Sequence, residues 1–283
     1  MELVEAREVS RDGEAGMESI IVTYLGVGAV AGLMAGLLGV GGGLVIVPML
    51  VFCLTRQGVP DEFIMHLALG TSMASIMFTA VSSFMAHHRH GAVHWSIVRQ
   101  ITPGILVGSF LGAYIASRMS TNYLKVFFVV FIFYVALQML TDRKPKPTRD
   151  VPGLAGMFGA GNVIGIVSSL VGIGGGTLSV PFMMWSNIAV HEAIGTSSAI
   201  GFPIAVAGAV GYVFNGWNAA DLPHYSLGYI YLPALAGIVV ASVVTAPLGA
   251  RLAHTLPVKK LKRVFAVLLI AVGTRMVVSL LHI

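Results

Sequence analysis

The glycine-rich stretch LLGVGGGLVIVP at residues 37–48 recurs with the same pattern as LVGIGGGTLSVP at residues 170–181. Each copy places three consecutive glycines inside an apolar run that would otherwise continue as a helix. One glycine in a helix interior costs about 1 kcal/mol relative to alanine, so three in succession predict a break. We therefore expect two broken helices, each of which resumes as a half-length segment near Leu44 or Thr177.

The composition indicates what surrounds these broken helices. Of the 283 residues, 56% are hydrophobic and 10% are charged, whereas a soluble domain carries roughly 25% charged residues. Eight of ten apolar stretches are long enough to span a bilayer as helices. The sequence predicts an all-α polytopic membrane protein with about eight full spans plus two half-length or re-entrant helices, or ten spans in all.

Two repeats account for most of the chain. The glycine-rich segments match at a spacing of 133 residues, HLALGTS at 66–72 matches HEAIGTS at 191–197 at a spacing of 125, and residues 111–128 match residues 248–265 at 137. Loop insertions between equivalent elements explain the changing spacing. Because each half holds an odd number of elements, we expect the halves to be inverted, a recurring plan of secondary transporters.

Charged loops divide the chain and orient it. We expect an acidic, disordered and external tail at residues 1–18, a first transmembrane repeat at 19–140, a basic cytoplasmic linker at 141–150 and a second repeat at 151–283. The net charge of the chain is +5, and outside the acidic tail its excess of basic residues, 15 against 6, falls in short segments between apolar runs, as is typical of an inserted protein. The expected surroundings are therefore a lipid bilayer, and no nucleic-acid partner is expected.

The glycine breaks are the first candidate site. Helices that start there would direct unpaired N–H groups and positive dipole ends at the break, an arrangement that suits an anion. The alternative is that the glycines only allow close helix contact. A dinucleotide-binding loop is excluded because the G-x-G-x-x-G spacing does not fit. The candidate residues are Gly41, Gly42, Gly43, Gly174, Gly175 and Gly176.

The paired HxxxGTS segments are the second candidate site. Their hydroxyls can either face a ligand or bond to carbonyls of their own helix, which is common in membrane helices. The two histidines titrate near neutrality and are candidates for proton coupling, with a helix-cap or interface role as the alternative. The candidate residues are Gly70, Thr71, Ser72, Gly195, Thr196 and Ser197, with His66 and His191 for the proton.

Other chemistries find less support. Four histidines between residues 87 and 94 resemble a metal tract, but they have no cysteine or carboxylate nearby and no counterpart in the second repeat. No hydrolase elbow or zinc-binding helix motif is present in the sequence. We therefore expect no metal site, no cofactor and no catalytic residue.

The duplicated glycine segments and the paired HxxxGTS segments resemble the sulfite exporter TauE/SafE family of membrane permeases. The resemblance covers nearly everything from Ile20 to Leu281. It implies a multi-pass transporter of the plasma (inner) membrane for sulfur-containing anions such as sulfite, sulfonates or sulfoacetate. It also implies that the substrate lies at the glycine breaks and at the two GTS segments.

The leading hypothesis is a secondary transporter that exports such an anion by alternating access, with proton coupling through the histidines. A passive anion channel of the same fold is the alternative. A membrane enzyme or a metal-binding protein is a third, less favoured hypothesis. A homodimer is compatible with each of them.

Overall fold

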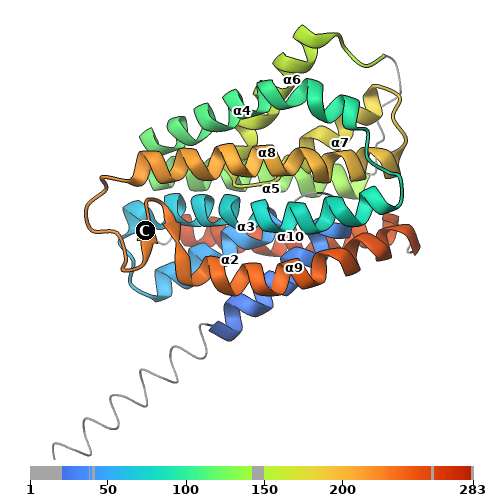
Figure 1. Cartoon of the computed structure of the whole chain (residues 1–283). Helices are drawn as coiled ribbons and strands as arrows, with labels where there is room; N and C mark the ends of the chain where they lie inside the picture. Colours follow the sequence, from blue (N-terminus) through green and yellow to red (C-terminus); the bar gives the residue numbers. More distant parts are fainter. Residues whose placement is uncertain (1–20, 38, 40–41, 142–149, 256–257, 282–283) are drawn as a thin grey trace, which may run out of the picture.

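The computed structural model describes residues 21–37, 39, 42–141, 150–255 and 258–281 (Figure 1). Within these ranges the chain forms ten helices and one two-stranded hairpin. The helices are Ile21–Leu37, α2 (Gly43–Arg56), α3 (Asp61–Arg89), α4 (Trp95–Arg118), α5 (Thr121–Thr141), α6 (Leu154–Val171), α7 (Gly176–Trp185), α8 (Val190–Gly216), α9 (Leu232–Thr255) and α10 (Val258–Leu281). Residues 1–18, residues 142–149 of the expected linker, and Gly41 lie outside the described residues.

Seven of these helices are long and apolar enough to cross a membrane. They are α3, α4, α5, α6, α8, α9 and α10. Two shorter apolar helices, Ile21–Leu37 and α2, accompany them. The predicted short segments after the glycine breaks are α2, with 14 residues, and α7, with 10. The prediction of a helical, multi-pass chain is confirmed, whereas the first expected full span is described over only residues 21–37.

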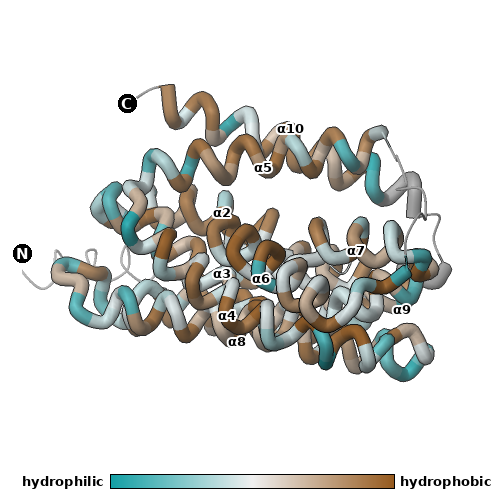
Figure 2. The backbone as a smooth tube through the Cα atoms, turned by 90° about the horizontal axis from the view of Figure 1, so that it is seen from above, coloured by the Kyte–Doolittle hydropathy of each residue, from teal (hydrophilic) through white to brown (hydrophobic). Residues whose placement is uncertain are grey.

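Helices α3 and α8 form the centre of the bundle. The most apolar windows of α3 and α8 are 83% and 67% buried, whereas those of the outer helices α9 and α10 are 28% buried. Apolar side chains that face outward, including Val130, Leu137, Val240 and Val267, suit contact with lipid. Figure 2 shows the apolar character of α5 and α10, which lie side by side along one face of the bundle.

Glycine seams join the outer helices across the two repeats. On α4, Gly104 and Gly108 lie against the backbone of Phe158 and Asn162 of α6, where an added methyl group would come within 2.1 Å of each carbonyl oxygen. On the first helix, Gly28 and the glycines that follow it lie in the same way against α9. The first helix of each repeat therefore packs on the fourth helix of the other repeat.

Equivalent central helices run in opposite directions. Gly208, in the second half of α8, lies against Met73, in the first half of α3, whereas Ser198, in the first half of α8, bonds to Ser83, in the second half of α3. Along the contact between the two helices, residue numbers therefore increase on α3 and decrease on α8. The two copies of the HxxxGTS helix are antiparallel neighbours.

One apolar run of the sequence, from Leu227 to about Ala250, becomes helical only at Leu232, where α9 begins. Its first residues lie in a hairpin, in which β1 (Ser226–Leu227) pairs antiparallel with β2 (Ile230–Tyr231). Gly228 adopts a φ of 53°, which supports the tight turn between the strands. The side chain of Thr71 accepts a hydrogen bond from the Tyr231 N–H at 2.9 Å, which holds the hairpin against α3.

The α4–α6 seam yields a matched test of packing. Gly108→Ala should lower the free energy of unfolding by about 1–3 kcal/mol, because the methyl group overlaps the Asn162 carbonyl. Gly159→Ala is the control, since Gly159 lies on α6 with nothing within 4 Å of an added methyl group. Thermal unfolding of the purified variants in detergent measures both. Equal destabilisation of the two would contradict the seam.

Candidate functional site

The glycine breaks adopt the same backbone conformation in both repeats. Gly42 has φ 76° and ψ −10°, and Gly175 has φ 77° and ψ −10°, immediately before α2 and α7 begin. Gly39 and Gly172 are also left-handed, with φ of 67° and 70°. This region favours glycine because a Cβ atom makes it costly. Neither half-helix has a side-chain cap, so its first N–H groups are left for another partner.

Each break is held by a serine of the opposite repeat. The Ser72 Oγ donates a hydrogen bond to the Gly172 carbonyl at 2.7 Å, and the Ser197 Oγ donates to the Gly39 carbonyl at 3.2 Å. The two serines are equivalent in the repeats, as are the two glycines. The Ser197 Oγ also lies 2.8 Å from the Ser179 Oγ of α7. The structure thus joins the two glycine breaks to the two GTS segments.

The neighbouring threonines make a second pair of crossed contacts. The Thr71 Oγ1 accepts from the Tyr231 N–H, and the Thr196 Oγ1 accepts from the His94 N–H, both at 2.9 Å. Gly70 and Gly195 lie against the carbonyls of Tyr229 and Ala92. The alternative of bonding within one helix describes Ser75, Thr79 and Ser198. It does not describe the four predicted hydroxyls, whose hydrogen bonds all reach other elements.

Close packing is also part of the role of these glycines. A methyl group on Gly43 would come within 2.0 Å of the Gly172 carbonyl oxygen, and one on Gly70 within 2.2 Å of the Tyr229 carbonyl oxygen. The two interpretations of the glycines therefore do not exclude each other. The breaks lie in the middle of the bundle because glycine lets the two halves approach there.

A small cavity lies beside the breaks, between α3 and α8. Its lining includes Gly39, Gly174 and Gly201 together with the hydroxyl-bearing Ser83 and Ser198. The two hydroxyl oxygens are 3.2 Å apart. The volume of about 10 Å³ is at the lower limit for a single water molecule. The structure is therefore closed around this point.

The repeat equivalent of this cavity is filled. At the positions that correspond to Ser198 and Ser83, the chain has Met73 and Gly208. The Met73 side chain lies so close to Gly208 that an added methyl group would come within 2.6 Å of its terminal carbon. The two halves are therefore alike in backbone and unlike in what occupies the space beside each break.

The two candidate histidines have different environments. His66 is 6% exposed, with Nδ1 2.9 Å from the Glu62 carbonyl and Nε2 3.2 Å from the Ala116 carbonyl. Its ring also stacks on Tyr229, with the centroids 5.0 Å apart. His191 is exposed at the start of α8. The repeat thus duplicates the residue type but not its burial.

A polar pocket of about 460 Å³ reaches His66 from one end of the bundle. Asp61, Glu62 and Tyr229 line it along with the histidine. Burial and the nearby Glu62 carboxylate raise the pKa of the Tyr229 phenol, which therefore stays protonated at neutral pH. The pocket brings His66 within reach of water and of two carboxylates.

Comparison with known proteins agrees with this arrangement. The family model described as "Sulfite exporter TauE/SafE" matches residues 24–276. The chain belongs to the TauE/SafE family. It is 40% identical to a probable membrane transporter protein of Haemophilus influenzae over 92% of this chain and 99% of the relative. It is also 28% identical to the probable membrane transporter protein YunE of Bacillus subtilis, over 92% and 98%. No solved structure gives a significant match.

In this TauE/SafE transporter, His87 contacts the first helix within its own repeat, whereas His94 contacts α8 of the other repeat. His87 is 1% exposed and its Nε2 lies 3.0 Å from the Gly36 carbonyl of the first helix. The His94 Nε2 lies 3.0 Å from a carboxylate oxygen of Glu192 of α8. Among the described residues, no three His, Cys, Asp or Glu side chains are grouped so that they could hold a metal ion.

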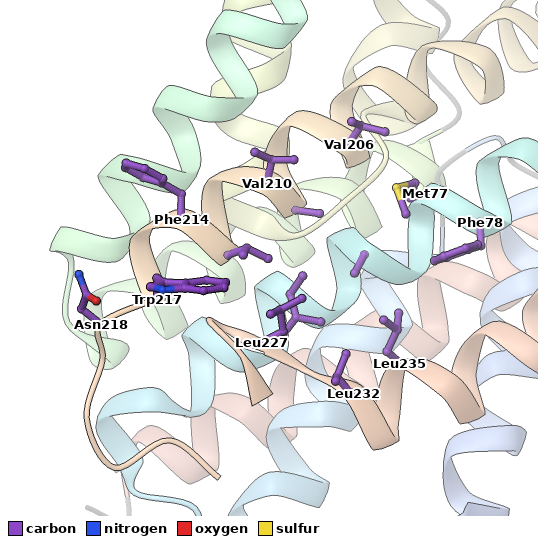
Figure 3. Close-up of a pocket in the computed structure, with 14 residues that line it drawn as sticks. Met77, Phe78, Val206, Val210, Phe214, Trp217, Asn218, Leu227, Leu232 and Leu235 are labelled. Carbon is purple, nitrogen blue, oxygen red and sulfur yellow. The ribbon is translucent and has the colours of Figure 1, made fainter. Parts of the chain in front are cut away.

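A wide groove on the transporter does not suit an anion. Its volume is about 760 Å³ and it lies between α3, α8 and α9. Figure 3 shows Met77 and Phe78 of α3 on one side and Val210 and Phe214 of α8 on the other. Asn218 and Trp217 supply the only polar side-chain groups of the lining residues, and no charged residue is among them. The groove is chemically matched to apolar chains.

Sequence reasoning missed Ser83, Ser198 and Ser179. Ser198 follows the GTS segment directly and Ser179 lies within the second glycine stretch, so both were near predicted residues. The repeat did not single out Ser83, because the equivalent residue in the second half is Gly208. Its place beside the break depends on the antiparallel pairing of α3 and α8, which only the structure shows.

The crossed hydrogen bonds can be tested by removing one hydroxyl. Ser72→Ala should lower the free energy of unfolding by about 1–3 kcal/mol, because the buried Gly172 carbonyl loses its partner. Ser75→Ala is the control, since the Ser75 hydroxyl is equally buried but bonds within α3. Thermal unfolding in detergent gives the comparison. A Ser72 variant no less stable than the Ser75 variant would contradict the crossed contact.

Proposed function

We propose that the protein is a secondary transporter that exports sulfite or a related sulfur-containing organic anion, such as a sulfonate or sulfoacetate, by alternating access. The observation that carries this proposal is the crossed contact of Ser72 and Ser197 with the two glycine breaks. Left-handed glycines precede both short helices, and these contacts join them to the opposite repeat. Membership of the TauE/SafE family supplies the substrate class.

The chemistry beside the breaks favours an oxyanion over a cation. The half-helices α2 and α7 begin there with uncapped N–H groups, and helix N-termini carry partial positive charge. The Ser83 and Ser198 hydroxyls line the small cavity and can each donate a hydrogen bond. The described residues that line this cavity include no carboxylate. Backbone amides and hydroxyls at Gly42, Gly43, Gly175, Gly176, Ser83 and Ser198 would then replace water around the anion.

The closed centre supports transport by alternation rather than a passive channel. A cavity of about 10 Å³ leaves no room for a hydrated anion, as an occluded state requires. Helices α3 and α8 are antiparallel, and Met73 fills the space on one side of the centre while a cavity remains on the other. This asymmetry fits two inverted halves that adopt different conformations. In this proposal, rocking of the halves exposes the breaks to each side in turn. A passive channel is the second candidate function, and it would require the same fold to adopt a permanently open conformation.

His66 supports coupling to protons. Both of its ring nitrogens face backbone carbonyls, which only accept hydrogen bonds. The protonated ring can donate to both, whereas the neutral ring leaves one nitrogen lone pair facing an oxygen. His66 lies about 9 Å along α3 from Ser72, at 1.5 Å per residue. A change of its protonation can therefore shift α3 relative to the end of α4, which carries Ala116, and with it the nearby break.

The transport proposal is tested by anion flux in proteoliposomes. We expect saturable, sulfite-driven flux in the wild-type protein, and a rise in KM of roughly tenfold in Ser83→Ala and Ser198→Ala, since each removes one hydrogen bond to a charged ligand. Ser82→Ala is the control, because Ser82 precedes Ser83 on α3 but bonds to the Val243 carbonyl. An unchanged KM in both cavity variants would place the substrate elsewhere, and a current that does not saturate would favour the channel.

The proton proposal is tested with His66→Gln. Glutamine can donate a hydrogen bond but does not titrate, so flux should persist while its dependence on a pH gradient is lost. His191→Gln should retain that dependence, because His191 is exposed and lies outside the polar pocket. Flux is measured with the same proteoliposomes at equal and unequal internal pH. Unaltered gradient dependence in His66→Gln would remove His66 from coupling.

A further inference from the structure

A second pocket, remote from the glycine breaks, lies between α2, α5 and α10. Its volume is about 300 Å³. Most of its wall is apolar, and Lys125, Arg275, Thr55 and Ser279 add the polar groups. It lies at the end of the bundle where α2 ends and α5 begins. None of its lining residues belongs to the candidate transport site, so its function can be examined independently of the proposed transport.

Positive charge is concentrated in this pocket. Lys125 is only 5% exposed, although it carries an ammonium group. The Arg275 guanidinium lies 4.1 Å from the centre of the Phe52 ring, and the Arg56 guanidinium lies 4.8 Å from the centre of the same ring. Two guanidinium groups thus share one aromatic ring, which stabilises each of them only in part. Lys125 adds a third cation as a lining residue of the same pocket.

Among the residues that the structure describes, no carboxylate is paired with these cations. The residues that line the pocket include neither Asp nor Glu. Across the described residues, no salt bridge involves Lys125, Arg56 or Arg275. Ionisable side chains in membrane segments are costly and usually have a partner. The pocket therefore has the charge of an anion site without an anion of its own.

The repeat shows that the fold does not need this charge. The positions equivalent to Arg275 and Arg56 are Gln138 and Ala189, and the position equivalent to Phe52 is Trp185. Both halves form the same helices with a neutral residue at two of the three cationic positions. The equivalent positions of the other repeat do not carry this concentration of charge, so folding alone does not explain it.

We propose that this pocket binds an amphiphilic oxyanion, a phosphate or sulfonate group that carries an apolar chain. Lys125 and Arg275 would hold the charged group, with Thr55 and Ser279 as hydroxyl partners at its edge. An arginine guanidinium matches the oxygens of such groups with two parallel hydrogen bonds. Met49, Val272 and Met276 offer the wall for the apolar chain. The ligand is either an anionic phospholipid of the surrounding leaflet or a soluble organosulfonate.

The test is ligand-induced thermal stabilisation of the full-length purified protein in a non-ionic detergent. The probes are phosphatidylglycerol in mixed micelles and hexanesulfonate in solution. Phosphatidylcholine and hexanol are the matched probes without net negative charge. We expect at least one anionic probe to raise the unfolding midpoint in a saturable way, and neither control probe to do so.

Variants assign the effect to the pocket. Arg275→Gln copies the residue that the repeat carries and should weaken the apparent Kd roughly tenfold or more. Arg275 is exposed, so this change should not impair folding. Arg118→Gln is the control, since Arg118 is also an exposed arginine over an aromatic ring, Tyr114, at the neighbouring end of α4, but it does not line the pocket. Lys125→Met tests the buried cation.

The outcomes separate the two sources of the ligand. Stabilisation by phosphatidylglycerol alone that is lost in Arg275→Gln supports a lipid site, and stabilisation by hexanesulfonate alone supports a soluble anion. Failure of both anionic probes to stabilise the wild-type protein would overturn the proposal. So would equal binding by wild-type and Arg275→Gln, or an equal loss in Arg118→Gln.

Discussion

The structure depends on satisfying backbone carbonyls that two broken helices leave unpaired inside a membrane protein. Hydrocarbon supplies no hydrogen bonds, so irregular backbone survives only where protein or enclosed water provides partners. Here Ser72 and Ser197 provide them, each for the glycine break of the opposite repeat. Neither half can complete its own break. The reciprocal arrangement fixes α3 and α8 against the short helices and explains why the GTS segment is duplicated together with the glycines.

Much of this arrangement could be predicted from the sequence. The repeat spacings and the glycine triplets predicted two half-length helices near residues 44 and 177, and α2 and α7 begin at Gly43 and Gly176. The hairpin at residues 226–231 could not be predicted by hydropathy, because the contact that stabilises it comes from Thr71, far away in the chain. For the same reason Ser83 was missed, since its position follows from how α3 crosses α8 rather than from a local pattern.

Departures from the repeat are as informative as the repeat itself. Duplicated residues hold the backbone in place, whereas unduplicated residues differ in the space and charge they supply. Met73 fills a volume on one side of the centre that Ser198 leaves open on the other. His66 is enclosed where His191 is exposed, because Tyr229 covers the first and the small Ala92 occupies the equivalent position in the second half. Such differences allow a protein built from two inverted repeats to favour one conformation over the conformation that the two-fold axis relates to it.

The first helix of each repeat packs against the other repeat, and this has a consequence for membrane insertion during synthesis. The groove that Gly104, Gly108 and Gly112 form on α4 is filled by α6, which follows it in the chain. The groove on the first helix is filled by α9, which emerges from the ribosome only near the end of synthesis. During translation the first helix must therefore wait in the bilayer or the insertion machinery with its glycine face uncovered. A gene split at the linker would give two products that each lack a partner for a glycine face.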